Sequence, residues 1–174
     1  MQDLWLLKQA SPDVDAVAAL KRSLPRLRCW QATDGALNYL YLPGDESPER
    51  TATLDWIRLA CIQEVEGASP RDMPRFHYVV ETDVLPEAEQ DLNAWYGEEH
   101  LPGLAAVPGV VRAARYVDAH GSPRYYACYD LARLEAFGSP PWLAVRATPW
   151  SSRVRPSFRN TSRTMFRVPG GSAC

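Results

Sequence analysis

Residues 76–119 read FHYVVETDVLPEAEQDLNAWYGEEHLPGLAAVPGVVRAARYVDA. This stretch decides the fold, because it contains three successive elements with different hydrophobic patterns. The run Phe76–Val84 predicts a strand, Pro86–Ala106 predicts a segment that is mostly helical, and Val110–Ala119 alternates as a strand does. The stretch therefore predicts a strand–helix–strand unit whose helix covers one face of a sheet.

The pattern continues towards the C-terminus. His120–Pro123 predicts a turn and Arg124–Leu131 predicts a strand. Ala132–Thr148 predicts an interrupted helical region, and Asn160–Val168 alternates enough to form a last strand.

The first part of the chain predicts the same order of elements. A strand is expected at Leu4–Ala10, followed by a helix that starts at Ser11-Pro12-Asp13 and ends at Leu24. Two strands are expected at Arg26–Thr33 and Ala36–Leu42, on either side of an Asp34-Gly35 turn. A second helix is expected to begin at Ser47-Pro48-Glu49, with an apolar stripe formed by Leu54, Ile57, Cys61 and Val65.

Two such passes predict an α+β fold built from two tandem ferredoxin-like repeats. Each antiparallel sheet has one face covered by its own helices, so the two halves are expected to cover each other in an intramolecular, pseudo-dimeric α/β barrel. The predicted boundaries are 1–66 for the first half, 67–75 for a linker, 76–168 for the second half and 169–174 for a flexible tail. An exposed sheet edge in each half would permit a homodimer.

Composition narrows the classes of function. The 174 residues carry a formal charge of −2, which gives no indication of a nucleic-acid or membrane partner. The four cysteines form no CxxC pair, and the apolar runs are shorter than the ~20 residues that span a bilayer. No signal peptide, P-loop or GxGxxG motif is visible. We therefore expect a cytoplasmic protein without a metal or a nucleotide cofactor.

Three segments of the second half carry a family resemblance. They are LNAWYGEEHLPGLAAVPG at 92–109, VRAARY at 111–116 and PRYYACYDL at 123–131. Together they resemble the EthD-like branch of the dimeric α/β-barrel superfamily, over residues 76–168. The first half lacks these motifs and is interpreted as a degenerate copy. The resemblance implies two ferredoxin-like sheets around a central cavity, but no single reaction. The superfamily includes haem-degrading and quinone-forming monooxygenases, muconolactone isomerases and polyketide cyclases.

His100 is the predicted catalytic residue. Tyr96 precedes it by one helical turn and Glu99 lies beside it, so both are predicted to contact the substrate. An imidazole is suited to acid–base work near neutral pH. The alternative is structural, in which His100 bonds Glu99 or a carbonyl left unpaired by Pro102 and fastens the end of the helix. A metal site is not predicted, because the other histidines, His77 and His120, lie in different elements.

Arg115 and Tyr126 complete the predicted substrate-binding set. In a strand, Tyr125 and Tyr129 share one face and Tyr126 takes the other. Tyrosines with an arginine suit an aromatic acid or a phenol, although the pattern favours cross-strand packing pairs.

Three functions follow as hypotheses. The first is binding or transformation of a small hydrophobic or aromatic metabolite in a cavity between the two sheets. The second is a non-catalytic ligand-binding or assembly module. The third is haem binding or degradation, which would need His100 as an axial ligand.

Overall fold

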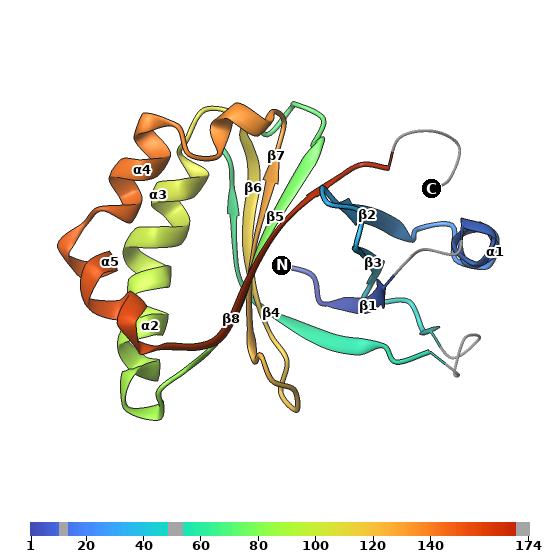
Figure 1. The fold of residues 1–174 in the computed structure, drawn as a ribbon, viewed down its shortest axis with the longest axis horizontal. Coiled ribbons are helices and arrows are strands. Elements are labelled where there is room, and N and C mark those ends of the chain that lie inside the picture. Colours follow the sequence, from blue (N-terminus) through green and yellow to red (C-terminus); the bar gives the residue numbers. More distant parts are fainter. Residues whose placement is uncertain (11–13, 49–53, 170–174) are drawn as a thin grey trace.

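The computed structural model describes residues 1–10, 14–48 and 54–169. Their antiparallel strands close into one barrel (Figure 1). The strands are β1 (Leu4–Ala10), β2 (Arg28–Ala32), β3 (Leu37–Pro43), β4 (Ile57–Glu66), β5 (Phe76–Val84), β6 (Val110–Val117), β7 (Tyr125–Leu131) and β8 (Phe158–Arg167).

The helices lie outside the barrel. Figure 1 shows α2 to α5 gathered on one side of the sheet and α1 at the opposite end of the molecule. They are α1 (Val14–Ser23), α2 (Glu89–Trp95), a π-helical turn (Tyr96–His100), α3 (Leu101–Ala105), α4 (Pro140–Arg146) and α5 (Pro149–Val154). None of the helices in the described ranges is long and apolar enough to cross a membrane.

The strand order explains how the barrel closes. In the first half the order is β4-β1-β3-β2, and in the second half the order β8-β5-β7-β6 follows the same scheme. Pairing of β4 with β6 and of β2 with β8 joins the two halves on both sides. The predicted intramolecular antiparallel barrel is therefore confirmed. The predicted free edges are wrong, because each outer strand pairs with the other half. A homodimer stays a prediction, although free sheet edges no longer support it. Duplication and the division into domains also stay predictions.

The second predicted helix of the first half is also wrong. Residues Ile57–Glu66 form β4, which pairs with β1 and β6. The apolar residues chosen for a helical stripe also fit a strand, because a bulge between Cys61 and Gln63 shifts the alternation. Leu59 therefore points into the barrel, whereas Val65 packs against the core under the helices. The pairing of β4 with two strands outweighs a weak local preference.

Other local predictions are confirmed. Residues 33–36 form the expected turn, in which Gly35 has φ 77° and its amide donates to the Ala32 carbonyl at 2.8 Å. The helix α1 ends at Ser23, close to the predicted end. Its predicted start at Ser11–Asp13, the segment around Glu49 and the tail beyond 169 lie outside the described residues.

Side chains fill three separate layers. One cluster occupies the barrel interior and includes Leu6, Tyr39 and Phe166. A second lies between the sheet and α2–α5, and a third lies under α1. Because strand residues alternate between the faces, neighbouring residues of β5 and β7 belong to different layers. This alternation separates the two sites described below.

Candidate functional site

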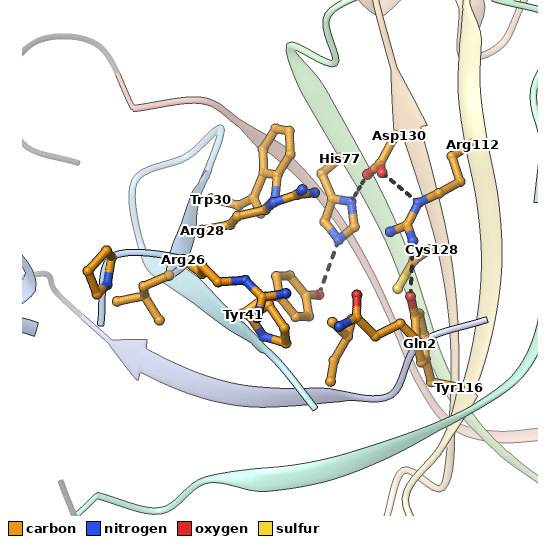
Figure 2. A pocket seen from close by; sticks show the side chains of 14 residues that line it. Gln2, Arg26, Arg28, Trp30, Tyr41, His77, Arg112, Tyr116, Cys128 and Asp130 are labelled. Carbon is orange, nitrogen blue, oxygen red and sulfur yellow. Dashed lines mark hydrogen bonds and ion pairs between the residues drawn. The ribbon is translucent and has the colours of Figure 1, made fainter. Parts of the chain in front are cut away.

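A cavity of about 390 Å³ occupies one end of the barrel interior (Figure 2). Its volume lies within the ~300–1,000 Å³ typical of small-molecule sites. Gln2, Arg26 and Arg28 are exposed and therefore mark its mouth, whereas His77 and Tyr41 are buried. The complete lining is Gln2, Leu4, Pro25, Arg26, Leu27, Arg28, Trp30, Tyr41, Pro43, His77, Arg112, Tyr116, Cys128 and Asp130.

A chain of three polar side chains lies in the wall of this cavity. His77 on β5 and Asp130 on β7 are direct cross-strand partners and both point inward. The Nδ1 atom of His77 lies 2.6 Å from Asp130 Oδ1, and its Nε2 lies 3.1 Å from the hydroxyl of Tyr41 on β3. Figure 2 shows the imidazole between the two partners. The arrangement needs all three strands, so only the assembled barrel creates it.

Asp130 is the charged end of this chain. Burial by itself would raise its pKa, but the hydrogen bond from His77 and the charges of His77 and Arg112 lower that pKa to about 2. Arg112 donates from Nε to Asp130 Oδ2 at 3.1 Å and from Nη1 to the Tyr116 hydroxyl at 3.4 Å. Asp130 is thus ionised at neutral pH and can only accept hydrogen bonds. His77 therefore donates from Nδ1, and its Nε2 faces the Tyr41 hydroxyl, which donates to the neutral ring or accepts from the protonated ring.

The tyrosine hydroxyls and the thiol of the wall stay protonated. Burial raises the pKa of the Tyr41 hydroxyl well above its ordinary value and also raises that of Tyr116. Burial likewise raises the pKa of the Cys128 thiol, which therefore is not a thiolate nucleophile. Tyr41, Tyr116 and Cys128 therefore supply no base, which leaves the His77 imidazole as the candidate proton acceptor of this wall.

The apolar part of the wall is aromatic. The ring of Trp30 stacks on the His77 imidazole, with 5.1 Å between centroids and 20° between planes. Tyr41 meets the same imidazole edge-on at 5.3 Å. At the mouth, Arg26 pairs with Asp45 and Glu46, each at 3.2 Å. The cavity thus combines flat rings, two arginines at its mouth and a buried base.

The predicted catalytic residue lies elsewhere. His100 and Tyr96 are buried outside the barrel, between the sheet and the helices, with ring centroids 5.3 Å apart. They line a crevice of only about 30 Å³. His100 stacks on Trp95 at 4.0 Å, and its Nδ1 has no hydrogen-bond partner among the described residues. Burial, followed by the charges of nearby arginines, lowers the His100 pKa to about 3, which makes it a weak base.

The hydrogen bond between His100 and Glu99 expected in the structural alternative is not present among the described residues. Glu99 accepts from Trp95 Nε1 at 3.2 Å and from Thr148 Oγ1 at 2.6 Å. It therefore connects the end of α2 to the start of α5 and does not bond His100. The turn at Tyr96–His100 is π-helical, and the Leu101 amide donates to the Tyr96 carbonyl. Pro102 has no amide hydrogen for the preceding turn, which favours this irregularity.

Of the remaining predicted residues, Arg115 lies next to Tyr96, whereas Tyr126 lies on the other face of the sheet. Arg115 lies outside the barrel, stacks over Tyr96 at 4.1 Å and donates to Asn93 Oδ1 at 3.0 Å. Tyr126 points into the barrel interior, on the opposite face from Tyr125, as predicted. It does not line the barrel cavity. The catalytic and substrate-binding roles given to these residues stay predictions.

Sequence analysis missed the His77–Asp130 pair. The signal was present in the alternation, since His77 shares a face with Val79 and Asp130 shares one with Cys128. A ferredoxin-like strand order places these two strands side by side. The polar residues on their inward faces, His77 and Asp130, could therefore have been predicted to be neighbours. In residues 1–10, 14–48 and 54–169, no group of three or more His, Cys, Asp or Glu side chains is placed to hold a metal ion.

Comparisons with known proteins reveal the fold. No protein-family model and no curated protein sequence matches the chain. Among solved structures, a ferredoxin-fold protein from Listeria monocytogenes related to antibiotic biosynthesis monooxygenases is similar, with a TM-score of 0.67 at 9% identity. The alignment covers 98% of this chain and 97% of that one.

Two further structures are similar. A monooxygenase-like protein from Listeria innocua has a TM-score of 0.64 at 11% identity, covering 98% of this chain and 96% of its own. A haem-degrading enzyme from Listeria monocytogenes has a TM-score of 0.61 at 9% identity, covering 95% and 99%. At these identities the likeness establishes a ferredoxin-like α/β-barrel fold and confirms the predicted resemblance at the level of the fold.

Proposed function

We propose that the barrel cavity binds a small aromatic metabolite and that His77 exchanges a proton with it. The observation that carries the proposal is the Asp130–His77 pair, 2.6 Å apart, in the wall of a cavity of about 390 Å³. A buried carboxylate bonded to one imidazole nitrogen orients the ring and stabilises the imidazolium that forms when the other nitrogen takes a proton.

The proton path follows from the hydrogen bonds. A bound hydroxyl or an acidic C–H placed near Nε2 would compete with the Tyr41 hydroxyl for the imidazole. On transfer the proton moves to Nε2, and the positive charge is balanced by Asp130, which Arg112 holds from its other oxygen. Tyr41 stays protonated because burial raises its pKa, so it can donate to the anion that the transfer leaves on the substrate.

The lining supports an aromatic substrate with an anionic group. Trp30 and Tyr116 offer rings for stacking, and Arg28 supplies positive charge at the mouth, where Arg26 is already paired with Asp45 and Glu46. The fold neighbours include a protein related to antibiotic biosynthesis monooxygenases, which fits small-molecule chemistry without selecting a reaction. The EthD-like affiliation and an origin by tandem duplication remain part of this proposal, supported by the motif at 92–109 and by the equal strand order of the halves.

Haem binding is less well supported by the residues of this chain. Both ring nitrogens of His77 are engaged, by Asp130 and Tyr41. His100 lines a crevice of about 30 Å³, and His120 is exposed between β6 and β7. None of the three histidines therefore presents a free nitrogen to a space large enough for a porphyrin.

The three histidines allow a matched experiment. Phenols, aromatic carboxylates and aryl ketones are screened for saturable quenching of tryptophan fluorescence, and each molecule that binds is then incubated with the protein in D₂O. Deuterium bound to carbon, measured by mass spectrometry after the hydroxyl deuterium has been exchanged back in H₂O, measures the proton exchange. We expect His77→Gln to lower the uptake rate ~10²–10⁴-fold. His120→Gln, at an exposed position, serves as the control and should leave the rate unchanged.

The outcomes separate the hypotheses. Loss of exchange in His100→Gln, with normal exchange in His77→Gln, would return catalysis to the originally predicted residue. Saturable binding that Trp30→Ala weakens, without deuterium uptake by any bound molecule, would favour a non-catalytic binding module. That second candidate has one observation in its favour, since both His77 nitrogens already have partners within the protein.

A further inference from the structure

The geometry points to a second binding site, on the outside of the barrel, for an oxyanion such as the phosphate or carboxylate group of a small molecule. Arg146, Arg155 and Arg163 converge there on the crevice of about 30 Å³ that His100 also lines. The crevice and the barrel cavity lie on opposite faces of β5 and β7, so this site is separate from the one proposed for proton exchange.

Three positive charges meet at this crevice without a compensating carboxylate. Arg146 ends α4, Arg155 follows α5 and Arg163 lies on β8. Among the described residues, no acidic side chain forms a salt bridge with any of the three. Burial, together with the charges of Arg146 and Arg163, lowers the pKa of Arg155. Arg155 Nη1 nevertheless donates to the Arg146 carbonyl at 3.4 Å, which holds the like charges together. Their mutual repulsion would be relieved by an anion.

Unpaired polar atoms in the crevice lining carry the second part of the argument. Trp142 Nε1, the Tyr129 hydroxyl and His100 Nδ1 have no hydrogen-bond partner within the described ranges. The three residues are 1%, 1% and 7% exposed, and all three line the crevice. Buried polar groups normally have partners, and three exceptions in one place indicate an occupant. An indole N–H can only donate and a phenol can donate, so the occupant must accept hydrogen bonds.

The size of the crevice restricts the occupant. A volume of about 30 Å³ accommodates one water molecule or one oxygen atom of a larger group. A phosphate or carboxylate satisfies both conditions, because one oxygen can reach the indole and the phenol while the others face the guanidinium groups. His100 is neutral at pH 7, since burial lowers its pKa to about 3, so it adds no charge of its own and can serve as a hydrogen-bonding neighbour.

The test uses inorganic phosphate and benzoate as separate probes at constant ionic strength. Binding is followed by calorimetric titration and by the NMR signal of the Trp142 indole N–H, which Trp142→Phe identifies. We expect at least one probe to bind saturably and to move that signal. Affinity should fall at least tenfold in Arg155→Gln and in Arg163→Gln; the latter changes an exposed strand position and guards against misfolding. Arg22→Gln, on α1 at the opposite end of the molecule, removes the same charge as a control (Figure 1).

Each result decides the proposal. Binding by phosphate alone would assign a phosphate group, and binding by benzoate alone would assign a carboxylate. If neither probe moves the Trp142 signal, or if Arg22→Gln weakens binding as much as Arg155→Gln, the site does not exist as described and water fills the crevice. His77→Gln should leave this binding unchanged, so failure of the barrel-cavity proposal would not affect the outcome.

Discussion

Asp130→Asn should expose how strongly the interior network depends on one charge. Asn has nearly the same shape, but its amide group cannot accept from Arg112 and from His77 at the same time. In the wild-type protein Asp130 accepts from both, at 3.1 and 2.6 Å. Removing one partner of a buried ion pair typically costs ~3–5 kcal/mol. Arg112 retains Glu64 at 3.5 Å and the Tyr116 hydroxyl, so we expect a loss near the lower end of that range at pH 7.

The contribution of the Asp130 charge to the free energy of unfolding can be estimated from its pKa, because this contribution depends on pH. The Asp130 pKa falls from an ordinary 3.8 to about 2 in the folded protein. A carboxyl whose folded pKa is lowered stabilises the protein above its unfolded pKa, and this contribution disappears as the pH falls through the folded pKa. The difference corresponds to about 2 kcal/mol, which should be present at pH 5 and lost progressively between pH 4 and pH 2.

Urea unfolding at a series of pH values measures this contribution, with tryptophan fluorescence as the signal. The difference in unfolding free energy between wild type and Asp130→Asn should shrink by about 2 kcal/mol on going from pH 5 to pH 2. Asp72→Asn changes an exposed carboxyl and should show no such trend. A wild-type-to-variant difference that is constant over this pH range would refute the charged network around Asp130.

Two further substitutions test the framework around the sites. Gly67→Ala should destabilise the protein by ~1–3 kcal/mol in thermal or urea unfolding, because a Cβ at this position would lie 2.2 Å from the Val110 carbonyl oxygen; an unchanged midpoint would contradict the close approach of these segments. Thr148→Ala should cost ~1–2 kcal/mol, because the Thr148 hydroxyl caps α5 by accepting from the Ser151 amide and also donates to Glu99. Thr148→Ser keeps the hydroxyl and should restore most of that stability, whereas equal losses in both variants would show that the cap is unimportant.

Local sequence patterns determined many of the elements. The Asp34-Gly35 turn follows from the ease with which glycine adopts a positive φ, and the strand at Phe76–Val84 follows from its apolar run. The strand Ile57–Glu66 could not be recognised in this way. Its apolar residues fit a helix as well as a bulged strand, and only its pairing with β1 and β6 selects the strand.

The candidate sites depend even more on tertiary structure. The motif around His100 was visible in the sequence, and the proximity of Tyr96 to His100 follows from their spacing on a helix. Whether that motif faces an open cavity depends on Trp95 and Trp142, which fill the space between sheet and helices.

What the sequence by itself determined is therefore the class of fold and most of the segments that build it, because periodicity and turn chemistry act over a few residues. The tertiary structure alone decided where a cavity remains and which polar groups meet in it. His77, Asp130 and Tyr41 come from three strands that are far apart in the chain, and they become neighbours only when the barrel closes. The hydrogen bonds and charges around Asp130 then lower its pKa, and burial raises the pKa of Tyr41; the unfolded chain provides neither environment.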